Sequence, residues 1–236
     1  MTLVPGLVGM AVETNCVYYR ETHRAAGEHL REGHSLRSVM DTLDFAALVG
    51  DVRAGNLAGL CAAVAESALR VQDAGADFVV ITSNTGHLGA GAARAALAIP
   101  LLDIRDVAVA DLRHRRARRA GLISTGVSQR TGLYDAALHD AGIDLLVPAP
   151  GEVARVDEVI FGELIHGVVS KSGAAAVQRV ADSLRRRGAD AILLACTDLT
   201  LLASRLRPAS AIVDTTVLHA RAAGRLATTP GVPRGG

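Results

Sequence analysis

The chain has 236 residues, of which half are hydrophobic, only 3% are aromatic and none is tryptophan. This length suffices for one large domain or two small ones, and a formal net charge of +1 gives no overall field that would attract nucleic acid or an anionic membrane. No uncharged stretch reaches the length of a membrane span, and no signal-like segment opens the sequence. We therefore expect a soluble cytoplasmic protein without nucleic-acid or membrane partners.

Apolar runs typical of buried strands alternate with amphipathic stretches of helix length along the sequence. The expected elements are strand 3–8, helix 13–31, helix 55–73, strand 78–82, strand 99–104, strand 120–124, helix 128–140, strand 191–195, helix 198–205 and strand 211–213. Buried strands separated by helices indicate a parallel, doubly wound α/β fold. The basic run from Arg113 to Arg119 is interpreted as a solvated helix end rather than a nucleic-acid patch.

The same plan occurs twice in the chain. Residues 75–85 (GADFVVITSNT) match residues 188–198 (GADAILLACTD) at an offset of 188 − 75 = 113, which makes Ser83 equivalent to Cys196. Residues 6–10 match 121–125 at an offset of 115, and Asp103 matches Asp214 at 111. We predict two similar doubly wound parallel-sheet α/β domains related by a pseudo-twofold, namely residues 1–105 plus 212–236 and residues 106–211. Ligands of such sheets bind beyond the carboxyl ends of the strands, so both strand ends are expected to face one cleft.

Cys196 is the strongest candidate for chemistry, because it ends an apolar strand and precedes an expected helix that begins near Thr197. A helix N-terminus lowers the pKa of a thiol from about 8.5, so we expect some thiolate near neutral pH. A thiolate can attack an electrophile or remove a proton from carbon. Cys16 and Cys61 lie within helical stretches and are expected to be buried and inert.

Small hydrogen-bonding side chains gather at the same strand ends. They are Ser83, Asn84, Thr85, Ser124, Thr125, Ser128 and Thr197. Each alone could be a helix N-cap, but together they favour a site for a carboxylate. Motifs for dinucleotides, nucleotide phosphates or zinc are missing, and Lys171, the only lysine, lies in a loop-like context unsuited to anchor pyridoxal phosphate. We expect a small carboxylate or amino-acid substrate, no cofactor and no metal.

With these residues identified, the sequence resembles the aspartate/glutamate racemase superfamily over nearly its full length. The matching segments are Gly6–Glu13 with Tyr18 and Tyr19, Thr42–Phe45, Ser83–His87, Ile160–Leu164 with Gly167, Leu194–Asp198, and Asp214–Thr216 with His219 and Ala220. The pattern is closest to the L-aspartate/glutamate-specific branch, which carries a hydroxyl residue in place of the first catalytic cysteine. The resemblance implies an isomerase that racemises amino acids without pyridoxal phosphate, with its active site in the cleft between two domains. By analogy, a homodimer is also expected.

The resemblance also implies a role for each matching residue. Cys196 and Ser83 would flank the α-carbon of the substrate, with Cys196 taking the proton from one face. The residues implied to bind the substrate are Met10, Asn84, Thr85, Thr125, Ser128 and Thr197. The residues implied to support the catalytic pair are Asp198, Asp44 and His87.

The chain departs from the family pattern in its catalytic pair. Ser83 stands where most members have a cysteine, and an alcohol is a far poorer base than a thiol near neutral pH. An asymmetric enzyme is expected, in which Cys196 serves one face and Ser83 relays a proton or positions a water. Since the second cysteine of two-cysteine relatives deprotonates the L-isomer, we expect an L-amino acid to be preferred.

The pocket wall departs as well. Ala11 and Val12 replace Gly and Pro, Phe161 replaces Tyr, and Ile165 or His166 falls where some relatives have Lys. No basic residue stands out as a partner for a substrate side-chain carboxylate. Arg53 and Arg105 could serve only if the fold brings them to the site.

Two alternative functions remain open at the sequence level. The superfamily contains single-cysteine arylmalonate decarboxylases, in which one thiol protonates an enediolate, and a lone Cys196 suits that chemistry. Loss of one catalytic cysteine could instead leave a non-catalytic binder of small carboxylates. Slow exchange of the substrate α-proton would distinguish a racemase from a binder.

Overall fold

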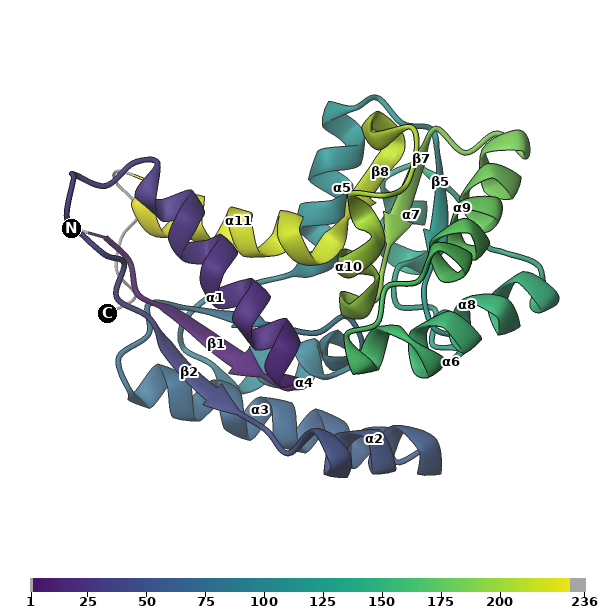
Figure 1. The fold of residues 1–236 in the computed structure, drawn as a ribbon. Helices are drawn as coiled ribbons and strands as arrows, with labels where there is room; N and C mark the ends of the chain where they lie inside the picture. Colours follow the sequence, from purple (N-terminus) through teal and green to yellow (C-terminus); the bar gives the residue numbers. More distant parts are fainter. Residues whose placement is uncertain (1, 230–236) are drawn as a thin grey trace. The chain divides into compact units, whose positions relative to one another are not determined.

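The computed structural model describes residues 2–229, apart from the side chains of Phe45 and Arg53, and these residues divide into two α/β units (Figure 1). The first unit contains the chain up to Ile104 and again from His219, and the second contains Arg105–Leu218. The predicted return to the first domain at residue 212 is therefore too early. Strand β8 (Ile212–Asp214) pairs with the second sheet, and the boundary falls within the following helix, α11 (Thr215–Thr228).

The first unit is built on a parallel sheet with strand order β2-β1-β3-β4. Its strands are β1 (Pro5–Gly9), β2 (Val39–Thr42), β3 (Phe78–Ile81) and β4 (Leu101–Leu102). Its helices are α1 (Val12–Gly27), α2 (Phe45–Ala54), α3 (Leu57–Asp73), the 3-10 turn η1 (Thr85–Gly89), α4 (Ala90–Ala96) and most of α11.

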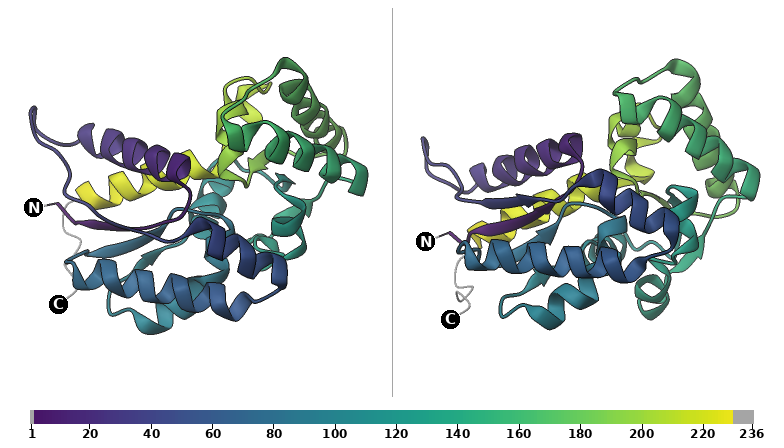
Figure 2. Two further views of the ribbon diagram at one scale, coloured as in Figure 1. Left: turned by 60° about the horizontal axis from the view of Figure 1, so that its bottom comes forward. Right: turned by 90° about the horizontal axis from the view of Figure 1, so that it is seen from below.

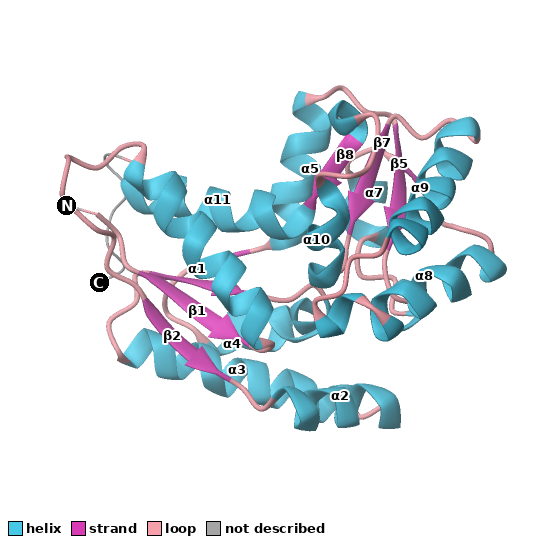
Figure 3. Ribbon diagram, viewed as in Figure 1, coloured by secondary structure: helices cyan, strands magenta, loops and turns pink. Residues whose placement is uncertain are grey.

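Alternate residues of β1 and β3 enter different cores, because successive strand side chains point to opposite faces. Leu7 and Val80 pack with α1 and α11, whereas Val8 and Ile81 pack with α2, α3 and α4. Figures 2 and 3 show these two helical layers on opposite faces of the first sheet. The strands are therefore buried on both faces, which explains their continuous apolar sequences.

The second unit repeats this sheet, with strand order β6-β5-β7-β8 and all pairs parallel. Besides β8, its strands are β5 (Arg119–Ile123), β6 (Asp144–Leu146) and β7 (Ala191–Leu194). Its helices are α5 (Ile104–His114), α6 (Gly126–Arg130), α7 (Asp135–Asp140), α8 (Pro150–Gly162), η2 (Leu164–His166), α9 (Lys171–Arg186), η3 (Thr197–Leu199), α10 (Thr200–Ala203) and η4 (Ala209–Ala211).

The two sheets confirm the predicted fold class of two similar parallel-sheet α/β units. In the first sheet Leu7 pairs with Val80, and in the second Leu122 pairs with Leu193 at the corresponding register. The segments β3 and β7 are 191 − 78 = 113 residues apart, which is the offset of the sequence repeat. Ser83 and Cys196 thus follow equivalent central strands.

Several elements differ from the sequence prediction. The expected helix 128–140 is two short helices, because Gly132 between them adopts a φ of +61°. The expected strand 99–104 pairs only at Leu101 and Leu102. The basic run begins in the last turn of α5, and Arg113–Arg116 are exposed, so its interpretation as a solvated helix end is confirmed. Within residues 2–229, no helix combines the length and the hydropathy needed to cross a membrane.

Candidate active site

At the carboxyl edge of the first sheet, the buried Asn15 side chain links the ends of β1 and β3. Asn15 Oδ1 accepts hydrogen bonds from the backbone N–H of Met10 at 3.1 Å and from the Thr82 hydroxyl at 2.9 Å. Gly9 leaves room for this side chain, since a Cβ there would lie 2.6 Å from Asn15 Nδ2. The predicted site residue Met10 is buried beside this network. Sequence reasoning missed Asn15, because its role depends on contacts with residues at the ends of β1, β2 and β3.

Ser83 follows Thr82 and is held by the turn that comes after it. Its Oγ accepts the backbone N–H of Gly86 at 3.2 Å, and its carbonyl oxygen lies 2.6 Å from His87 Nδ1. The predicted residues Asn84, which is buried, and Thr85, which is half-buried, belong to the same turn. Asp44 comes two residues after the end of β2, at the same carboxyl edge of the sheet, and caps α2 by accepting the Ala46 N–H at 3.0 Å.

His87 acts as a neutral bridge in this turn. Its Nδ1 faces a carbonyl oxygen, and its Nε2 accepts the backbone N–H of Ile104 at 3.2 Å, so the ring proton lies on Nδ1. Both ring nitrogens are therefore occupied by the backbone. The arrangement suits a residue that positions Ser83 rather than one that transfers protons.

A second histidine packs against the first. The rings of His87 and His219 are 5.3 Å apart edge to face, and His219 Nε2 donates to the Leu102 carbonyl at 3.0 Å. The Tyr18 hydroxyl in turn donates to His219 Nδ1 at 2.9 Å. Burial, together with the neighbouring His87, lowers the pKa of His219 to about 3, so the ring is neutral near neutral pH. Tyr18 and His219 are therefore buried behind His87, which holds the Ser83 turn.

At the carboxyl edge of the second sheet, the β5 end carries Thr125 and Ser128. Thr125 caps α6 by accepting the Ser128 N–H at 3.2 Å, and its hydroxyl donates to Ser128 Oγ at 3.0 Å. The Gly126 N–H donates to Asp157 Oδ1 at 3.0 Å. The Gly126 N–H is thus already bonded to the Asp157 carboxylate, which sequence reasoning missed. A substrate carboxylate there would use the hydroxyls instead.

Cys196 follows β7 and Ala195 in extended conformation, and its side chain is half-buried. Its Sγ lies 3.7 Å from Asp198 Oδ2, a contact in which the thiol donates to the carboxylate. Burial and the adjacent Asp198 charge raise the pKa of the Cys196 thiol to about 12. Burial likewise raises the pKa of Asp198 above its ordinary value.

The expectation of a thiolate at Cys196 near neutral pH is therefore wrong. The helical segment that follows the cysteine is the turn η3, which begins at Thr197 and carries Asp198 in its first turn, followed directly by the four-residue helix α10. So short a segment offers little dipole, and its acidic residue opposes negative charge on sulfur. Cys196 is therefore a neutral thiol that donates a hydrogen bond to the Asp198 carboxylate.

The other two cysteines differ from each other. Cys16 is exposed on α1, which corrects the expectation that it is buried. Its neighbours in sequence, Val12 and Tyr19, are exposed on the same helix, so the apolar character of the segment did not predict burial. Cys61 is half-buried, with its thiol 3.5 Å from the Leu88 carbonyl oxygen.

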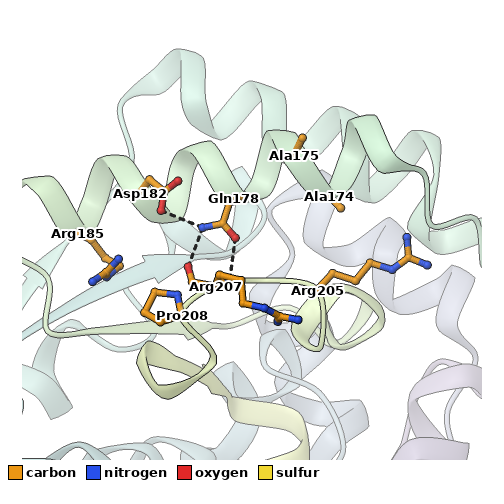
Figure 4. Close-up of a pocket in the computed structure, with 8 residues that line it drawn as sticks. All are labelled: Ala174, Ala175, Gln178, Asp182, Arg185, Arg205, Arg207 and Pro208. Carbon is orange, nitrogen blue, oxygen red and sulfur yellow. Dashed lines mark hydrogen bonds between the residues drawn. The ribbon is translucent and has the colours of Figure 1, made fainter.

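A hollow of about 580 Å³ lies between α9 and the segment after α10 (Figure 4). Gln178 spans it, binding Asp182 Oδ1 at 2.9 Å and both the N–H and the carbonyl of Arg207 at 2.8 Å. Arg205 donates to the Val169 carbonyl at 3.3 Å, and the arginines point in different directions. None of the predicted site residues lines this hollow, and no group of three or more potential metal ligands occurs among residues 2–229.

Comparison with known proteins shows the family of the chain. The family model described as Asp/Glu/Hydantoin racemase matches residues 7–223. The chain belongs to this family. It is therefore an isomerase of the racemase type, as the sequence resemblance predicted.

Individual relatives agree with this assignment. The racemase is 22% identical over 162 residues to the broad specificity amino-acid racemase RacX of Bacillus subtilis strain 168, covering 67% of this chain and 68% of the relative. A crystal structure from Yersinia pestis, provisionally described as an Asp/Glu racemase, superimposes with a TM-score of 0.88 at 28% identity, covering 97% of this chain and all of the other. The aspartate racemase homologue PH1733 of Pyrococcus horikoshii OT3 shares the fold, with a TM-score of 0.82 at 20% identity and coverages of 97% and 100%.

Proposed function

We propose that this racemase inverts an amino acid without a cofactor, with Cys196 as the acid–base group on one face of the α-carbon and Ser83 on the other. The observation that carries the proposal is the contact between Cys196 Sγ and Asp198 Oδ2 at 3.7 Å, at the carboxyl end of a central strand. Equivalent strand ends place Ser83 in the corresponding position of the first sheet. We further propose that the enzyme works in the cytoplasm.

The proposed mechanism depends on the protonation state of the Cys196 thiol at rest. A thiol with a pKa of about 12 is almost entirely protonated near neutral pH, so it is ready to donate a proton to a carbanion. To remove an α-proton it must first lose its own, and Asp198 Oδ2 is the acceptor within reach. The ammonium group of a bound amino acid lowers the pKa of a nearby thiol and thereby assists that transfer.

Ser83 cannot repeat this chemistry unaided. Its hydroxyl already accepts the Gly86 N–H at 3.2 Å, and an alcohol near neutral pH holds its proton far more tightly than a thiol. Ser83 is therefore proposed to relay a proton through a water on its face. This asymmetry favours the L-isomer, which the face served by Cys196 deprotonates in two-cysteine relatives.

Substrate binding is assigned to the hydroxyls and amides of the strand-end turns. The residues proposed to hold the substrate α-carboxylate are Asn84, Thr85, Thr125, Ser128 and Thr197, with Met10 contributing to the pocket. Hydroxyl and amide groups suit an anion that must be bound and released, because they donate hydrogen bonds without forming an ion pair.

Proton NMR in deuterium oxide tests this proposal. The protein is incubated with L- and D-isomers of acidic and neutral amino acids, and loss of the α-proton signal is followed for wild type, Cys196→Ala and Ser83→Ala. We expect exchange with wild type, none with Cys196→Ala, and a faster reaction of the L-isomer. Exchange that survives in Cys196→Ala would overturn the role of the thiol.

A second candidate is decarboxylation of an arylmalonate, which a single neutral thiol favours. That reaction requires a proton donor for an enediolate, and Cys196 at rest is a proton donor. An arylmalonate decarboxylase shares the fold, with a TM-score of 0.53 at 17% identity and coverages of 97% and 93%. Release of carbon dioxide from an arylmalonate, without α-proton exchange of amino acids, would favour this reaction. Binding of carboxylates with neither reaction would indicate a non-catalytic binder.

A further inference from the structure

Large apolar side chains are exposed around the carboxyl edge of the second sheet. Phe161 is 48% exposed, Ile165 45%, Val168 52% and Leu201 43%. Phe161 is the penultimate residue of α8, Ile165 lies in η2, Val168 follows η2, and Leu201 lies in α10, directly after the Cys196 turn. Exposed apolar groups gathered beside a reactive residue indicate a binding surface rather than scattered surface residues.

The packing beneath these side chains connects them to Cys196. Leu164 of η2 and Leu199 of η3 belong to one buried cluster, against which Cys196 itself packs. The turns η2 and η3 are in direct contact. Ile165 therefore lies in a turn that contacts the Cys196 turn, and Leu201 lies in α10, which directly follows η3.

Positive charge is missing from the same segments. Residues 160–170 and 195–204 contain neither lysine nor arginine. Their carboxylates are Glu163, which accepts the Ser170 hydroxyl at 2.6 Å, and Asp198, which faces the thiol. A second substrate carboxylate held against these two segments would meet the Glu163 and Asp198 carboxylates and no lysine or arginine of the segments themselves, and burying an unpaired charge is costly.

The turns that follow β1 and β3 in the first unit are similar, with no lysine or arginine and an exposed apolar side chain. Residues 9–12 and 82–90 also lack lysine and arginine, and Val12, at the start of α1, is 69% exposed. Arg94 is ion-paired with Asp103 at 2.7 Å. Arg105, in the first turn of α5, is the basic residue that follows β4.

From this distribution we infer that the racemase takes amino acids with an apolar side chain, which packs against Phe161, Ile165 and Val168 beside Cys196. The inference rests on the proposed function, because it presumes that Cys196 reacts at the α-carbon. It differs from the acidic substrates of the family's aspartate and glutamate racemases. Burial of an apolar side chain on this surface removes apolar area from water on both partners.

The test compares α-proton exchange in deuterium oxide for L-leucine, L-methionine and L-phenylalanine with that for L-aspartate and L-glutamate. We expect kcat/KM to be at least about tenfold higher for one or more of the apolar substrates. Faster exchange of aspartate or glutamate would overturn the inference while leaving the racemase mechanism intact, and would point to Arg105 as the cation. Exchange with none of the five would overturn the proposed function itself.

A pair of variants locates the side-chain site. Ile165→Lys places a cation in η2, the turn that contacts the Cys196 turn, and should shift the ratio of acidic to apolar rates by about tenfold towards aspartate and glutamate. The matched control Ile165→Gln has similar length but no charge, and should lower the apolar rates without raising the acidic ones. If Lys and Gln lower all rates equally, Ile165 does not contact the substrate side chain, and the assigned wall is wrong. Melting curves of both variants confirm that they are folded.

Discussion

The two strand ends after β3 and β7 occupy equivalent places in their sheets but differ in chemistry. At Ser83 the turn is fixed by backbone contacts of His87, which is itself backed by His219 and Tyr18. At Cys196 the thiol faces a carboxylate, and the position equivalent to His87 (87 + 113 = 200) is Thr200, which donates to Asp214 Oδ1 at 3.2 Å. Similar folds thus support different side-chain chemistry at equivalent strand ends, a titratable pair at one and a backbone-bonded turn at the other.

The largest expected effect comes from making the two ends alike. Cys196→Ser replaces the thiol by a hydroxyl of the kind already present at Ser83, and should reduce α-proton exchange by about a thousandfold. The loss follows because an alcohol neither donates a proton to carbon nor removes one from it at a useful rate near neutral pH. Single-turnover NMR in deuterium oxide measures it. A loss of less than about tenfold would mean that the two ends do not differ in the way proposed.

Removing the Asp198 carboxylate tests its effect on the pKa of the Cys196 thiol separately from its effect on the exchange rate. Asp198→Asn removes a charge that raises the pKa of the thiol, so that pKa should fall while exchange drops by about ten- to a hundredfold for want of a proton acceptor. Iodoacetamide labelling against pH, read by mass spectrometry at Cys196, measures the first change. The exposed Cys16 in the same digest is the reference. A thiol pKa that rises in this variant would contradict the assigned electrostatics.

Placing a second thiol at position 83 tests the Ser83 strand end in the same way. Ser83→Cys should raise the exchange rate of the D-isomer by about tenfold and leave that of the L-isomer within a few-fold, because a thiol on the Ser83 face supplies the missing base. Rates for both enantiomers, measured under identical conditions, give the ratio. Ser83→Ala is the matched control, and it should lower both directions. An unchanged ratio in Ser83→Cys would remove residue 83 from the reacting face.

The smallest effect concerns stability rather than rate. The folded pKa of His219, about 3, lies below the ordinary value of 6.5, so the unfolded chain binds the extra proton between these pH values. The contribution of this buried neutral ring is complete above about pH 6.5 and is lost as the pH falls towards 3, by up to about 1.4 kcal/mol per pH unit. His219→Gln should flatten the pH dependence of the urea midpoint over this range. An identical slope in wild type and variant would contradict a buried neutral His219.

The repeat made much of the fold predictable. Three paired segments at nearly one offset predicted two parallel sheets, because central strands buried on both faces have continuous apolar sequences. Strand β2 was missed, since Val39–Thr42 alternates between half-buried and exposed residues at a sheet edge. The break between α6 and α7 depends on the backbone of one glycine, Gly132.

The sequence could predict which candidate residues follow the central strands, but not the electrostatics around them. Ser83 and Cys196 could be paired because local sequence places each at a strand end. The raised pKa of Cys196 depends on where the Asp198 carboxylate points and on burial, neither of which has a sequence pattern. The Tyr18–His219 contact joins residues 201 positions apart, and Asp157 reaches Gly126 from another helix, so both depend on tertiary structure.

Helix α11 has a consequence for how the chain is made. It completes the first unit, where Ala220, Ala223 and Ala227 pack with Tyr18, and the Leu3 N–H donates to the Ala227 carbonyl at 2.8 Å. The second unit, by contrast, is one continuous segment, Arg105–Leu218. Because most of α11 is synthesised after the whole second unit, the first unit cannot complete its core ahead of the second, so the usual amino-terminal-first order of domain folding does not apply.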